Sequence, residues 1–126
     1  MTVTSSAQAL RALERPEQLD ALVNDSHQRP ILIFKHSRTC GTSAEAFDQL
    51  QSFIEDRDGA EIYLVDVLRH RSASQAVASR FGIRHESPQA LVLRNGQVVW
   101  HGSHYRVTVG AIRGAIADPA EPTAVS

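Results

Sequence analysis

The sequence contains a single cysteine in 126 residues, which excludes an internal disulfide and a disulfide-stabilised secreted scaffold. Charge of either sign is not in excess, because 13 basic residues balance 14 acidic ones, so no global field favours nucleic acid or an anionic membrane. No apolar run approaches the ~20 residues that span a bilayer. Residues 1–18 also lack the basic-then-apolar pattern of a signal peptide. These absences favour a soluble, cytoplasmic protein with neither nucleic acid nor membrane as a partner.

The length is sufficient for one domain with an ordinary hydrophobic core. We expect a single domain over residues 1–126, with an ordered core from about 9 to 118 and a flexible C-terminal tail over 119–126. No internal repeat is evident, so the periodicity of apolar residues is the main guide to the fold.

Residues 31–43, ILIFKHSRTCGTS, place the only cysteine between a predicted strand and a predicted helix. The apolar run from Ile31 to Phe34 predicts a buried strand, and helical spacing from a capping box at Thr42 to about residue 55 predicts the helix. Unpaired amides in a first helical turn carry partial positive charge, which lowers the pKa of a nearby thiol. Cys40 is therefore a candidate nucleophile. The alternative is an inert buried cysteine, which is a common state of the free residue.

The remaining patterns predict an alternation of strands and helices. The predicted elements are a short edge strand within 9–13, a helix opened by Pro16, a strand over 61–67, a helix from a capping box at Ser72 to Gly82, a hairpin turning at Asn95-Gly96 and a last helix capped by Thr108. The hairpin register pairs Leu93 with Val98 and Leu91 with Trp100 on one face. A βαβ crossover followed by a hairpin and a helix predicts an α/β fold in the thioredoxin-like order, with a central mixed sheet of four to five strands flanked by helices.

The residues around the cysteine suggest that the protein can form a mixed disulfide but cannot resolve it by itself. Cys40 and Ser43 form a CxxC-type motif with serine in the second position, where Ser43 can donate a hydrogen bond to the thiolate but cannot resolve a disulfide. A second thiol must then come from another molecule. Lys35, His36 and Arg38 would favour the thiolate and bind carboxylates of a small thiol, or else they are ordinary solvated charges.

A metal site is a weaker interpretation of the histidines. His101 and His104 form a His-x-x-His pair that, with His36 and Cys40, contains atoms able to bind zinc. The pair lies in a predicted loop after a strand, and no second cysteine or nearby carboxylate completes a set of ligands. We therefore expect polar loop histidines and no metal.

Two segments, FKHSRTCGTSAEAF and GIRHESPQALVLRNGQVVWHGSHY, together with their spacing, resemble the monothiol bacilliredoxin (YtxJ-like) family from about Glu17 to Ile116. The resemblance implies a thioredoxin-like fold and removal of the small thiol bacillithiol from protein mixed disulfides. It makes Cys40 the attacking residue, Ser43 the replacement of a resolving cysteine and Pro88 a cis-proline beside the site. The partners that it implies are S-thiolated client proteins, the low-molecular-weight thiol as co-substrate and a reducing redoxin or reductase. The residues expected to position the substrate are Lys35, His36, Thr39, Gly41, Thr42, Ser87, Pro88 and Gln89.

The chain departs from this family between the cysteine and the serine. Members often read Thr-Cys-Pro-Ile-Ser, whereas this chain has Gly41-Thr42, which loosens the loop. The glycine is similar to monothiol glutaredoxins of the Cys-Gly-Phe-Ser type, which bind an iron–sulfur cluster between two subunits. Cluster binding or a scaffold role is thus the alternative function. Thr42 and the GIRHESPQ segment favour the bacilliredoxin interpretation, for which no resident cofactor is expected.

Overall fold

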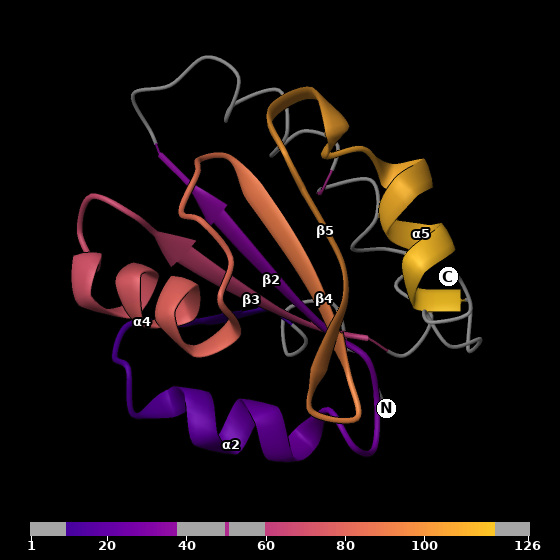
Figure 1. The fold of residues 1–126 in the computed structure, drawn as a ribbon, viewed down its shortest axis with the longest axis horizontal. Coiled ribbons are helices and arrows are strands. Elements are labelled where there is room, and N and C mark those ends of the chain that lie inside the picture. The colour runs from indigo at the N-terminus through magenta and orange to yellow at the C-terminus, as the bar shows by residue number, and fades with distance from the viewer. Residues whose placement is uncertain (1–9, 38–49, 51–59, 118–126) are drawn as a thin grey trace.

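The computed structural model describes residues 10–37, 50 and 60–117, and these form a sheet with helices on both faces (Figure 1). The elements are β1 (Leu10–Ala12), α2 (Gln18–Asp25), β2 (Ile31–His36), β3 (Glu61–Asp66), α4 (Arg71–Phe81), β4 (Gln89–Arg94), β5 (Gln97–Ser103), the 3-10 turn η1 (His104–Arg106) and α5 (Val109–Ala117). Of the helix predicted between 42 and 55, only Leu50 is among the described residues, and it is helical and buried. No helix in these ranges is long and apolar enough to cross a bilayer.

The sheet has five strands in the order β1-β3-β2-β4-β5. Strand β3 runs parallel to both β1 and β2, while β4 is antiparallel to β2 and to β5. The parallel pair β2 and β3 requires a long crossover, and β4 and β5 are joined by the tight Asn95-Gly96 turn. The predicted mixed sheet, including its weak first strand, is confirmed.

Alternation along β2 divides the core into two layers. Ile31 and Ile33 face the layer under α2 and α4, whereas Leu32 and Phe34 face the layer under α5. Figure 1 shows α2 and α4 on one side of the sheet and α5 on the other. Because β2 and β4 are covered on both faces, they read as continuous apolar runs in the sequence.

The hairpin contains one irregularity that the sequence pattern did not predict. Leu93 pairs with Val98 as expected, but a bulge follows, so that Trp100 lies opposite Val92 and not Leu91. The extra residue reverses the alternation of side chains beyond it. Trp100 therefore packs on the α5 layer, while Leu91 and Leu93 belong to the α2 and α4 layer, and the predicted shared face is wrong for Trp100.

The sequence signals for helix ends are confirmed at Gly82 and Thr108 and are wrong at Pro16 and Ser72, since α2 begins at Gln18 with Glu17 as its N-cap. Gly82 ends α4 with φ of 65°, the left-handed conformation that glycine adopts without a Cβ penalty. The amide of Ala111 donates to Thr108 Oγ1 over 3.2 Å, which confirms the cap of α5. Helix α4, however, begins at Arg71 with His70 as its N-cap, so Ser72 already lies inside the first turn and the predicted capping box does not form.

Candidate functional site

The carboxyl end of β2 lies beside a cis-proline loop. Lys35 pairs with Gln89 across β2 and β4, and the Ser87–Pro88 peptide bond preceding Gln89 is cis, as the family resemblance implies. Cys40 lies outside the described residues, as do Thr39, Gly41, Thr42 and Ser43. Cys40 follows His36, the last residue of β2, by four residues in the sequence.

Lys35 reaches this region from inside the protein. Its side chain is 0% exposed, and its Nζ lies 3.1 Å from Nδ1 of His85, a residue of the loop before the cis-proline. Ser74 Oγ of α4 lies 3.3 Å from the same nitrogen. Burial lowers the pKa of Lys35 to about 8. Burial, followed by the charge of Lys35, also lowers the pKa of His85. The three side chains join β2, α4 and the loop; Lys35 and Ser74 are buried, whereas His85 is exposed.

His36, the last residue of β2, presents its ring on the opposite face of the sheet from Lys35. It is partly buried and stacks on Phe34, with ring centroids 5.9 Å apart and planes inclined by 8°. Phe34 is fully buried in the layer under α5, so this stacking ties the orientation of the imidazole to the core.

The residues flanking the cis-proline are polar; Gln89 is buried, and Ser87 is partly buried with its hydroxyl oxygen shielded from solvent. Gln89 is 2% exposed, and its Nε2 donates to the Arg84 carbonyl over 3.0 Å and to Ser103 Oγ over 3.4 Å. Within the described part of the chain, Gln89 Oε1 and Ser87 Oγ have no hydrogen-bond partner. A buried polar group without a partner costs about 1–3 kcal/mol, and such groups are few in native proteins. The two oxygens are therefore candidate contacts for a substrate backbone.

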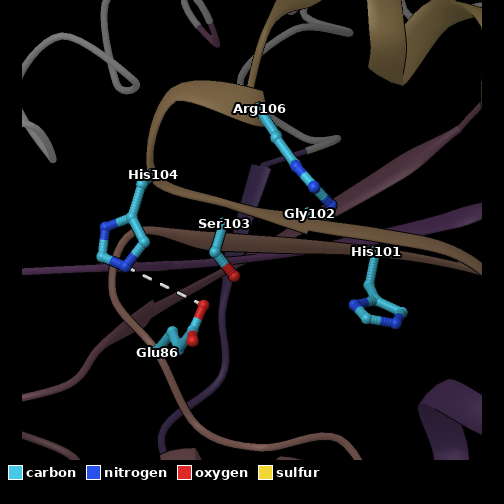
Figure 2. Close-up of a pocket in the computed structure, with 6 residues that line it drawn as sticks. All are labelled: Glu86, His101, Gly102, Ser103, His104 and Arg106. Atoms are coloured by element: carbon cyan, nitrogen blue, oxygen red, sulfur yellow. Dashed lines mark ion pairs between the residues drawn. The ribbon is translucent and has the colours of Figure 1, made fainter.

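A pocket of about 320 Å³ adjoins the same loop (Figure 2). Its lining residues come from the loop, β5 and η1: Glu86, His101, Gly102, Ser103, His104 and Arg106. The amide of His104 donates to the Pro88 carbonyl over 2.9 Å, which connects the pocket wall directly to the cis-proline. Gly102 is required at the base, because a Cβ there would lie 2.9 Å from the Trp100 ring.

The structure places four of the predicted substrate-positioning residues, Lys35, Ser87, Pro88 and Gln89, at the adjoining ends of β2 and β4. The His36 ring lies on the other face of the sheet, against Phe34. It adds residues that the sequence analysis did not assign to a site: Ser74, Glu86, Ser103 and Arg106. Glu86 belongs to the GIRHESPQ segment that the sequence analysis singled out. No local sequence pattern indicates that residues of β5 and η1 line a pocket next to it. His101 and His104 share the pocket, yet no group of three metal-ligating side chains occurs in the described ranges.

The fold matches solved thioredoxins over nearly their whole length. Thioredoxin from Fasciola hepatica is 20% identical, with a TM-score of 0.68 over 85% of this chain and 96% of the other. A mutant thioredoxin from Halobacterium salinarum NRC-1 is 19% identical, with a TM-score of 0.71 over 96% and 97%. A further structure, described as a candidate oxidoreductase with a thioredoxin fold, is 29% identical, with a TM-score of 0.78 over 90% and 98%.

A thioredoxin fold with a cis-proline loop at the carboxyl end of the central strand defines the class of thioredoxin-like thiol oxidoreductases. Within that class, the profile of monothiol bacilliredoxin BrxC matches residues 11–112. The chain belongs to the monothiol bacilliredoxin family.

Proposed function

We propose that the protein removes bacillithiol from mixed disulfides on client proteins, with Cys40 as the single nucleophile. The observation that carries the proposal is the position of the β2 end. It lies against the cis-proline loop of a bacilliredoxin-family chain, and its only cysteine follows within four residues.

The chemistry is a thiol–disulfide exchange without net oxidation. The Cys40 thiolate attacks the bacillithiol sulfur, the sulfur–sulfur bond to the client breaks, and the client sulfur leaves as a thiolate that takes up a proton from water. A new disulfide joins Cys40 to bacillithiol. Because Ser43 has no thiol, a second small thiol or a dithiol redoxin must attack this disulfide and restore Cys40.

The surrounding residues have separate roles in this proposal. Thr39, Gly41, Thr42 and Ser43 surround the nucleophile in sequence, and the role we assign to Ser43 is to donate a hydrogen bond to the Cys40 thiolate. The backbone of Ser87 and Pro88 and the amide of Gln89 align the disulfide. Lys35 contributes positive charge from below, since its ammonium is buried against His85 and not presented to solvent.

The test follows the small thiol by intact mass. Reduced protein is mixed with a client that carries bacillithiol on one cysteine, and both masses are recorded over time. We expect the adduct to move from the client to the wild-type protein. Cys40→Ser should leave the client modified, while Ser43→Ala should retain the adduct on Cys40 and form it more slowly. The proposal is rejected if the client stays modified in the presence of wild-type protein.

A further inference from the structure

The pocket beside the cis-proline has a charge at each end. Figure 2 shows Glu86 and His104 on one side, 3.8 Å apart between Oε1 and Nε2, and the Arg106 side chain with His101 on the other. The Ser103 hydroxyl lies between the two groups. The lining therefore offers a carboxylate and a guanidinium to the same small volume.

The acidic end is ordered by a chain of hydrogen bonds from the core. Gln89 Nε2 lies 3.4 Å from Ser103 Oγ, and the hydrogen bond of the Ser103 hydroxyl to Glu86 is the main cause that lowers the pKa of that carboxyl group. Glu86 is consequently ionised at neutral pH, and its carboxylate is directed by a buried residue adjacent to Pro88.

His104, which lines the pocket beside Glu86, has an unusual backbone conformation. His104 has φ of 55°, a region that residues with a Cβ rarely adopt, and its amide is bound to the Pro88 carbonyl. Its position is thus determined by the cis-proline loop and by the ion pair with Glu86.

We propose that this pocket binds the charged groups of the small thiol, with a thiol carboxylate on Arg106 and a thiol ammonium on Glu86. This inference rests on the proposed function and specifies its substrate as a zwitterionic low-molecular-weight thiol. A volume of about 320 Å³ is at the lower limit of ligand pockets, which suits a small polar molecule. Bacillithiol carries an amine and carboxylates, so it presents both charges that the pocket complements.

The experiment compares two small thiols on one client. The client is prepared with bacillithiol or with 2-mercaptoethanol, which has no charge, and the rate of transfer to Cys40 is measured by mass for each. We expect Arg106→Gln and Glu86→Gln each to slow bacillithiol transfer about fivefold, the loss expected for one partly exposed charge pair. Transfer of 2-mercaptoethanol should slow less than transfer of bacillithiol, because this thiol has no charge for either side chain to bind. Far-UV circular dichroism spectra that match wild type show that the variants are folded.

Arg80→Gln is the matched control, since Arg80 is bound to Asp20 between α4 and α2, away from this pocket. Arg106→Lys should recover most of the bacillithiol rate because it restores the charge. Equal slowing of both thiols, or no difference between Arg106→Gln and Arg80→Gln, overturns the pocket assignment while the proposed function stands. If wild-type Cys40 takes up neither thiol, the proposed function fails and this inference fails with it.

Discussion

At the carboxyl end of β2, one buried residue, Lys35, brings a positive charge to the cis-proline region while its ammonium group stays shielded from solvent. Lys35 is as buried as its aliphatic neighbours on the strand, and its ammonium meets an imidazole and a hydroxyl from other elements. Desolvation disfavours the charged form of a buried lysine, which explains the lowered pKa. The side chain is thus close to deprotonation at mildly alkaline pH, whereas an exposed lysine would stay charged.

This burial predicts a pH dependence of stability. The pKa of Lys35 is about 8 in the folded protein, against ~10.4 when unfolded, so between these values the unfolded chain binds more protons. The free energy of unfolding contributed by this residue therefore rises with pH, by about 2 kcal/mol between about pH 7.5 and about pH 9.5. Urea unfolding of wild type and Lys35→Met across this range measures the difference. Parallel curves for the two proteins would show that the lysine is not desolvated.

At the level of elements, a buried serine after α2 fixes the tip of the β4–β5 hairpin. Ser26 is 1% exposed, and its carbonyl accepts a hydrogen bond from the amide of Asn95 over 2.8 Å. Its hydroxyl accepts another from the amide of Gly96 over 2.7 Å and donates to the Val23 carbonyl over 2.6 Å. Both turn residues have positive φ, as a type I′ turn requires. The distant helix end therefore satisfies amides that the tight turn leaves unpaired.

Ser26→Ala is expected to lower the free energy of unfolding by about 1–2 kcal/mol, because the Gly96 amide loses its acceptor. The matched control is Ser72→Ala, since Ser72 is exposed in the first turn of α4 and does not serve as its N-cap. This control should change the stability by less than ~0.5 kcal/mol. Chemical denaturation measures both, and equal effects of the two substitutions would contradict the anchoring role of Ser26.

For the whole molecule, the sheet order puts the site next to the most enclosed strands. Strands β2 and β4 are covered on both faces and paired on both edges, whereas β1 is a three-residue strand at an edge. The site elements are thus anchored at the ends of the best-packed strands, which is the arrangement that positions functional groups accurately.

Amide hydrogen exchange should reflect this arrangement. We expect the slowest exchange in Ile31–Phe34 and Ala90–Leu93, and the fastest strand exchange in Leu10–Ala12, because opening an edge strand exposes little apolar surface. Mass spectrometry of peptides from the reduced protein gives the order. Protection of β1 equal to that of β2 would mean that the sheet opens only as a whole.

The sequence by itself determined the fold class and the absence of a second cysteine that could resolve a disulfide at Cys40. Apolar runs, glycine turns and Thr108 are local signals, and the absence of a second cysteine limits the reaction whatever the structure. Tertiary structure alone decided that Lys35 is buried against His85, that a bulge turns Trp100 to the other face, and that His70 caps α4. It also assembled Glu86, Ser103 and Arg106 around one pocket. These features depend on contacts between residues far apart in the chain, which periodicity and capping patterns do not encode.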